Sequence, residues 1–178
     1  MNDSASRSAL ARVNARLESA LGPVVAALCG ALALTVLWQV ATRLTARVAL
    51  ALDVPTPIEP SRWTEELASF LLAWTALLGA AYALRRGEHI GLDLVYVRFG
   101  AAGRARIDRI ARAAVVAFGA LIAAGGAWLT WLTWVLEQRT PALGWPMGLV
   151  YAVLPLAGLL MAAFAAERAY VDTTEAAP

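Results

Sequence analysis

The chain has 178 residues and contains no lysine, a single cysteine and a single histidine. Cys29 has no second cysteine to pair with, so an intramolecular disulfide is excluded. His89 alone cannot ligate a haem from two sides, and no group of residues has the spacing of a zinc site. No glycine-rich phosphate loop precedes a helix in a βαβ context. We therefore predict no cofactor, no metal ligand and no catalytic residue, and we expect that the chain is not an enzyme.

Charged residues are missing from the middle of four long apolar stretches, at residues 22–42, 65–85, 113–136 and 145–166. Each has the length of about 20 residues that crosses the hydrocarbon core of a bilayer. Hydrophobic residues make up 60% of the chain, and its mean hydropathy is +0.62. The sequence therefore predicts an all-α integral membrane protein with four transmembrane helices, short loops and candidate amphipathic helices at the membrane surface.

The uncharged middle of these stretches also bears on function. Ion relays and solute pathways in membranes usually depend on ionisable groups at depth that face a cavity. Because none is present, we expect no substrate-binding residue, and we interpret the chain as a membrane scaffold or subunit and not as a pump by itself. No segment is left for a soluble domain of about 50 residues or more, so we expect no nucleic-acid partner.

The expected organisation has three parts: an N-terminal amphipathic segment at residues 1–20, a four-helix membrane domain at residues 21–168 and a short tail at residues 169–178. The helical spacing of leucines in the first part suits the headgroup layer, and a disordered tail is the alternative. The first apolar run is longer than the core of a signal peptide, so we interpret it as a retained span. Residues 43–54 either continue this helix or bend onto the membrane surface, before Pro55 ends any helix.

The placement of the arginines predicts the orientation. Eleven of the 15 basic residues lie in the N-terminal segment, in the connection 85–112 or at Arg168, and four lie in the other connections. The side richer in arginine is expected to be cytoplasmic. Both termini are therefore predicted to face the cytoplasm.

Small and aromatic residues mark further features of the expected helices. Gly125 and Gly126 lie near the middle of the third stretch, where small residues allow another helix to approach closely, so we predict a helix contact there. Pro155 is expected to kink the fourth stretch. Amphipathic tryptophan rings anchor helices at membrane boundaries, and we assign this role to Trp63, Trp128, Trp131, Trp134 and Trp145.

The stretch from residue 63 to residue 94 has the most specific pattern. It opens with Trp63-Thr64-Glu65-Glu66-Leu67-Ala68, continues through an apolar helix with Trp74 and Gly79, and ends with Arg85-Arg86-Gly87-Glu88-His89-Ile90-Gly91-Leu92-Asp93-Leu94. This pattern resembles the signature of the small membrane subunit of tripartite ATP-independent periplasmic (TRAP) transporters, the DctQ family. By this resemblance the motif positions are candidates for a partner interface: Glu65, Glu66, Arg85, Arg86, Gly87, His89, Ile90, Gly91 and Asp93.

The resemblance implies a function and its partners. A subunit of this type pairs with a large permease of the DctM type, which carries the sodium and substrate sites. A periplasmic binding protein of the DctP type delivers an organic acid, and the sodium gradient drives its uptake across the bacterial inner membrane. The small subunit is expected to act as a fixed scaffold among membrane lipids, against which the transport domain moves.

The two charged pairs of the motif have proposed roles and plainer alternatives. Glu65 and Glu66 would cap their own helix and meet a cation of the partner near the periplasmic face, or they only satisfy the helix dipole. Arg85 and Arg86 would hold the cytoplasmic end through phosphates or partner carboxylates, or they only enforce the topology.

The turn that follows is expected to be tight, because Gly87 and Gly91 flank His89. His89 is otherwise a solvated loop residue, and Asp93 would cap the next segment or pair with a cytoplasmic arginine. Two other functions stay open at this point. The chain could be a structural subunit of another membrane complex, or a stand-alone small exporter that works as an oligomer.

Overall fold

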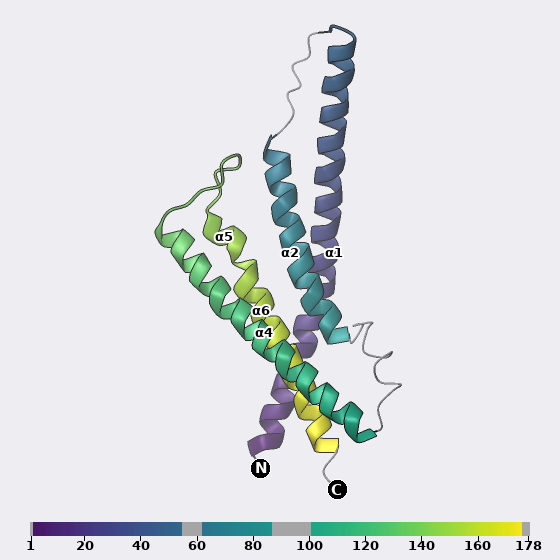
Figure 1. The fold of residues 1–178 in the computed structure, drawn as a ribbon, viewed down its shortest axis with the longest axis vertical. Coiled ribbons are helices and arrows are strands. Elements are labelled where there is room, and N and C mark those ends of the chain that lie inside the picture. Colours follow the sequence, from purple (N-terminus) through teal and green to yellow (C-terminus); the bar gives the residue numbers. More distant parts are fainter. Residues whose placement is uncertain (1, 55–61, 87–100, 176–178) are drawn as a thin grey trace.

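The protein is a bundle of long helices (Figure 1). The structure, a computed structural model, describes residues 2–54, 62–86 and 101–175. Within these residues it contains five helices: α1 (Asn2–Ala51), α2 (Arg62–Arg86), α4 (Ala101–Val135), α5 (Met147–Tyr151) and α6 (Val153–Glu175). The one β-type pairing in the described part of the chain is a single bridge between Arg139 and Pro146. The predicted all-α fold class is confirmed.

Among the described residues, four helical segments are long and apolar enough to cross a membrane: Arg16–Ala51, Arg62–Arg86, Arg106–Val135 and Met147–Glu167. Each overlaps one of the stretches expected from the sequence. The first is much longer than expected, because regular helix extends from Arg16 through residues 43–51, and α1 as a whole begins at Asn2. The described part of the segment after Thr42 therefore extends α1 and does not turn away from it.

The helices form two pairs that meet through α2 and α6. α1 packs along α2, α4 packs along α6, and α2 lies against α6. Both chain ends lie at the lower end of the view in Figure 1, which we call the terminal end. The opposite end, which we call the loop end, contains the loop 136–146 and the last turn of α1. The termini therefore share one end, as an even number of spans requires.

α1 contacts the rest of the bundle through one narrow seam. Between residues 18 and 49, the buried and half-buried positions of α1 recur at alternating intervals of three and four residues, with Gly22 as the one exception. This is the spacing of a coiled-coil seam. These positions are Glu18, Leu21, Val25, Leu28, Leu32, Thr35, Gln39, Thr42, Ala46 and Ala49. Only 6% of the apolar window of α1 is buried, against 44% for Met147–Glu167. Most of the surface of α1 is therefore free to meet lipid or another protein.

The apolar core lies between α1, α2 and α6. It is formed by Leu21, Leu78, Ala81, Val153, Ala157, Leu160, Met161 and Phe164. Trp74, Leu77 and Tyr82 of α2 pack against this cluster. α2 is thus the central helix, with contacts to α1 on one side and to α6 on the other.

Glycine allows α4 and α6 to approach closely. A Cβ added at Gly158 would lie 2.5 Å from the backbone nitrogen of Ala123 and 2.6 Å from the carbonyl oxygen of Gly119. Distances this short leave no room for any side chain, so the two backbones touch through their small residues. Such seams are the usual means of association for helices in lipid, where no hydrophobic force drives the helices together.

Two helices end at the loop end with an acidic residue in the left-handed region. Asp53 follows α1 with φ 53°, and Glu137 follows α4 with φ 49°. In each case the next N–H turns back to a carbonyl five residues earlier, from Val54 to Ala49 at 3.0 Å and from Gln138 to Thr133 at 3.1 Å. This pattern satisfies the last carbonyl groups of a helix. α1 therefore ends before Pro55, through its own terminal turn.

The fourth span is interrupted at Ala152, between the end of α5 and the start of α6. Pro155 cannot donate to the carbonyl four residues before it, and its ring crowds that turn. Near the interruption, the indole Nε1 of Trp74 in α2 donates to the carbonyl oxygen of Val150 at 3.1 Å. The kink expected from Pro155 is therefore observed as a break in the helix at Ala152, three residues before the proline. The hydrogen bond from Trp74 of the central helix lies beside this break.

Gly125 and Gly126 should respond to alanine in opposite ways. A Cβ at Gly126 would lie 2.5 Å from the Cβ of Leu154, whereas a Cβ at Gly125 would meet nothing within 4 Å. Gly126→Ala should lower the free energy of unfolding by about 1–3 kcal/mol through overpacking. Gly125→Ala should raise it by about 0.5–1 kcal/mol, because alanine loses less backbone freedom on folding. Melting of the purified chain in detergent measures both changes, and a shift in the same direction for both variants would contradict this packing.

Candidate functional site: two polar clusters that join the helices

At the terminal end, Arg85 of α2 connects three helices. Its Nε donates to Oε2 of Glu18 in α1 at 3.1 Å, and its Nη1 donates to Oε2 of Glu167 in α6 at 2.8 Å. Asn14 of α1 donates from Nδ2 to the same Glu167 oxygen at 2.5 Å. We call these four residues the terminal cluster. It joins the first, second and last helices at one point.

The terminal cluster is mostly shielded from solvent. The side chain of Arg85 is 17% exposed, and those of Glu18 and Glu167 are 34% and 18% exposed. The guanidinium of Arg85 also lies over the ring of Phe164, 5.7 Å from its centroid. A guanidinium offers five donors in a rigid plane, which allows it to bind two carboxylates and an aromatic face at once. A partly buried ion pair of this kind fixes geometry, because removing one member leaves an uncompensated charge.

The bend of α1 helps to bring Asn14 and Glu18 to this point. Pro23 lies inside α1 and removes one hydrogen-bond donor from the helix interior, which favours a kink. In Figure 1 the N-terminal part of α1 is inclined to the remainder and lies near the C-terminal part of α6. Asn14 is 6% exposed. Asn14 therefore joins α1 to α6 through a polar contact.

At the loop end, the acidic pair of α2 binds two different parts of the chain. Glu65 forms an ion pair with Arg43 of α1 and accepts a hydrogen bond from Nε2 of Gln39 at 3.3 Å. Glu66 accepts from the backbone N–H groups of Ala142 at 2.9 Å and Leu143 at 2.8 Å through its Oε2. We call Glu65, Glu66 and these partners the loop cluster. One carboxylate holds α1, and the other holds the loop between α4 and α5.

Four residues of the predicted motif lie in the described part of the chain: Glu65, Glu66, Arg85 and Arg86. In the structure each of them contacts another residue of the same chain. Arg86 lies over the ring of Tyr82, 5.4 Å from its centroid. The cation near Glu65 comes from α1 of the same chain, and a second cation from a partner stays a prediction. The five remaining motif positions fall within residues 87–100, outside the described residues: Gly87, His89, Ile90, Gly91 and Asp93.

The other candidate residues lie as follows. Gly126 faces α6, whereas Gly125 faces open space and has no contact partner in the described chain. The tryptophan side chains expected at the membrane boundary are all exposed, and the rings of Trp128 and Trp131 lie 5.2 Å apart. Their relative exposures are 43% for Trp63, 63% for Trp128, 55% for Trp131, 60% for Trp134 and 43% for Trp145. Anchoring in a headgroup layer stays a prediction for them.

Sequence reasoning missed three members of the terminal cluster. Asn14 and Glu18 lie in the segment predicted to be amphipathic, and Glu167 directly follows the fourth predicted stretch, 145–166. A signal for the first two was present, because they continue the three-and-four spacing of the α1 seam toward the N-terminus. Polar residues on the buried side of a helix need partners. No pattern within Met147–Glu167 indicated that Glu167 would meet Arg85.

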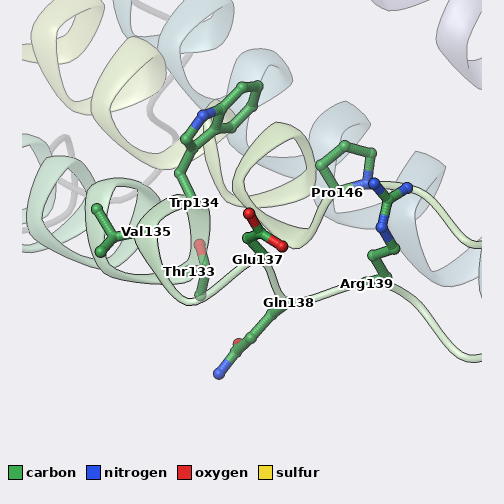
Figure 2. Close-up of a pocket in the computed structure, with 7 residues that line it drawn as sticks. All are labelled: Thr133, Trp134, Val135, Glu137, Gln138, Arg139 and Pro146. Atoms are coloured by element: carbon green, nitrogen blue, oxygen red, sulfur yellow. The ribbon is translucent and has the colours of Figure 1, made fainter.

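A hollow beside the end of α4 has a volume of about 430 Å³. Figure 2 shows the side chains that line it: Thr133, Trp134, Val135, Glu137, Gln138, Arg139 and Pro146. The loop around it is held by its own bonds, from the N–H of Met147 to the carbonyl of Gln138 at 2.8 Å and from Nη1 of Arg139 to the carbonyl of Gly144 at 3.2 Å. These two bonds stabilise the loop beside the hollow.

The fold and the two clusters define a multi-pass helical membrane protein whose charged side chains join its helices to one another. Residues 56–175 match the family described as tripartite ATP-independent periplasmic transporters, DctQ component. The chain belongs to this family, as the motif predicted. It is similar to the C4-dicarboxylate TRAP transporter small permease protein DctQ of Rhodobacter capsulatus, with 34% identity over 99 residues. That match covers 56% of this chain and 44% of the relative, so it spans less than half of the relative's length.

Replacing Arg85 by alanine should destabilise the bundle strongly. Glu18 and Glu167 would lose their shared cation, and breaking a buried pair in this way costs about 3 kcal/mol. Arg47→Ala is the matched control, since Arg47 is exposed and forms no ion pair with a described residue, and surface substitutions of this kind usually change stability by less than about 0.5 kcal/mol. Thermal melting of both variants in detergent checks the difference. Equal losses for the two arginines would mean that the terminal cluster does not hold the helices.

Replacing Glu66 by alanine should free the loop between α4 and α5. Hydrogen bonds to a charged acceptor contribute about 1.5–3 kcal/mol each, so backbone exchange at residues 140–146 should accelerate about tenfold or more. Hydrogen–deuterium exchange of the purified chain measures this change. Glu65→Ala is the control, because Glu65 binds α1 and should leave exchange in the loop unchanged. Faster loop exchange in the Glu65 variant alone would reverse the assignment of the two carboxylates.

Proposed function

We propose that the chain is the bracing subunit of a TRAP transporter, which holds a large permease in the membrane while that permease moves the solute. In this proposal the large permease carries the sodium and substrate sites, and a periplasmic binding protein delivers the solute. The sodium gradient drives uptake. Family membership supports the proposal, because residues 56–175 match the small component of such systems.

The observation that carries the proposal is the position of charge along the described helices. Charged side chains of the described spans lie toward the helix ends, where the terminal cluster and the loop cluster are formed, and the middle of each span has none. A pathway for an anion or a sodium ion needs polar groups at depth. Charges that pair across helix ends instead make a rigid body, which suits a part against which another subunit moves.

An organic acid is the proposed class of solute. The name of the similar protein from Rhodobacter capsulatus refers to C4-dicarboxylates. Discrimination among such acids would belong to the large permease and the binding protein, since the proposed role of this chain involves no contact with the solute. A stand-alone exporter is less favoured, because such a protein would need its own ionisable group at depth.

The proposed location is the bacterial inner membrane, with both termini in the cytoplasm. The distribution of arginines supports this orientation, as the terminal end and the connection after α2 are the richest in arginine. The loop end would then face the periplasm. The acidic pair of α2 and the loop 136–146 would lie on the side from which the binding protein delivers solute.

Isolation and reconstitution test the proposed function. The tagged chain, purified from native membranes in mild detergent, should bring with it a multi-span permease identified by mass spectrometry. Liposomes with both membrane subunits should take up the acid only with an inward sodium gradient and the binding protein present. Liposomes with this chain alone should show no counterflow. Transport by the chain alone, or copurification with a haem- or quinone-binding assembly, would contradict the proposed function.

A further inference from the structure

Both helices of the α4–α6 pair have a point of weakness at the same depth. The fourth span is interrupted at Ala152, and Pro155 lacks the N–H group that would close the next turn. The residue of α4 beside this break is Gly126, because a Cβ added there would lie 2.5 Å from the Cβ of Leu154. Gly126 follows Gly125, and sharp bends of long helices occur mainly at proline and at pairs of glycine or serine. We call this depth, with the glycine pair on α4 and the break on the fourth span, the hinge level.

Packing within the described chain gives no reason for glycine at position 125. A Cβ at Gly126 would meet α6, whereas a Cβ at Gly125 would meet nothing within 4 Å. Glycine in the interior of a helix is less stable than alanine, because it loses more backbone freedom on folding. A glycine that no contact demands is explained if α4 bends at this depth.

The part of the chain beyond the hinge level is held together by its own contacts, and we call it the outer hairpin (residues 127–151). α5 packs against the end of α4, since a Cβ added at Gly148 would lie 2.8 Å from Cε3 of Trp134. The loop between them is closed by the N–H of Thr140, which donates to the carbonyl oxygen of Trp145 at 2.8 Å. The outer hairpin is therefore a unit that keeps its shape when it moves.

The terminal side of the hinge level is fixed to α2. Leu78 of α2 and Ala157 and Leu160 of α6 belong to one buried apolar cluster, which cannot separate without exposing its surface. The break itself is also tied to α2, because the indole Nε1 of Trp74 donates to the carbonyl oxygen of Val150 at 3.1 Å. These contacts fix the position of the pivot.

The far end of the outer hairpin is held to α2 by one carboxylate. α4 and α5 depart from α2 toward the loop end in Figure 1, and Glu66 spans the distance by accepting from the N–H groups of Ala142 and Leu143. Ala142 is exposed, so water can replace the carboxylate there. From Gly126 to Val135 the helix rises about 14 Å, so a bend of about 20° would move its end by about 5 Å. A movement of this size breaks both hydrogen bonds.

We propose that the outer hairpin swings about the hinge level, with Glu66 as the latch that holds it closed. The structure shows the closed form. In the open form the loop leaves Glu66, while the contact between Trp74 and Val150 keeps the pivot in place. This inference concerns the chain alone, so it goes beyond the proposed function and does not depend on it. It gives the loop end a movable part, whereas the terminal end stays fixed.

Distances between pairs of spin labels test the hinge in the full-length chain in lipid nanodiscs. Cys29→Ala removes the single native thiol, and cysteines introduced by Leu72→Cys on α2 and Leu136→Cys at the end of α4 carry the labels. The control pair combines Leu72→Cys with Leu159→Cys, which lies on α6 on the terminal side of the hinge level. All three leucines are exposed, at 58%, 57% and 62%, so the labels do not disturb the packing.

Three substitutions change the latch and the hinge separately. Glu66→Ala should raise the population with a longer distance between positions 72 and 136 about tenfold or more, because two hydrogen bonds to a charged acceptor are lost. Glu66→Gln keeps an acceptor oxygen without the charge, so its population should lie between those of the unmodified chain and the alanine variant. Gly125→Ala, added to Glu66→Ala, should lower the long-distance population about two- to fivefold, because alanine resists bending of the helix.

Each outcome supports or overturns the inference. A longer distance between positions 72 and 136, with an unchanged distance in the control pair and suppression by Gly125→Ala, supports it. A change in both pairs means that the whole bundle loosens, and unchanged distances in both Glu66 variants mean that there is no open form. If Gly125→Ala leaves the long-distance population unchanged, α4 does not bend at the glycine pair. Each of these three results overturns the inference and leaves the proposed function as it stands.

Discussion

The shared binding of two carboxylates by Arg85 holds the bundle together at the terminal end. α2 is the helix between the two helix pairs, and its last turn places one guanidinium between Glu18 of α1 and Glu167 of α6. Without that cation two partly buried carboxylates would face each other in a region of low polarity. The packing of Leu21, Leu78 and Phe164 beside the cluster depends on the same three helices meeting there.

The loop end is organised by the same physical rule with different partners. Glu65 meets an arginine, whereas Glu66 meets two backbone amides, so adjacent carboxylates tie α1 and the loop 136–146 to one helix terminus. Within the membrane no water is available to bind a free polar group. The chain therefore keeps charge at the two ends of its helices, and it joins the apolar parts through close glycine contacts at Gly119, Gly126 and Gly158.

This arrangement gives a body that is braced at both ends and exposed along most of α1. A subunit that braces a larger permease needs both properties. Rigidity comes from the two clusters and the α4–α6 seam, and the free surface of α1 would leave room for the proposed partner. Family membership and the geometry thus support the same role from independent directions.

The sequence by itself determined the class of fold, the four spans and the family. Apolar runs of about 20 residues have the length of a transmembrane helix, which satisfies its own backbone in lipid, and the motif from Trp63 onward carried the family. Only the tertiary structure decided which charges pair. Glu18, Arg85 and Glu167 are far apart in the chain, and their contact depends on the bend of α1 and the approach of α6 to α2. It also separated Gly125 from Gly126, because adjacent helix positions face directions about 100° apart, and only one of them meets α6.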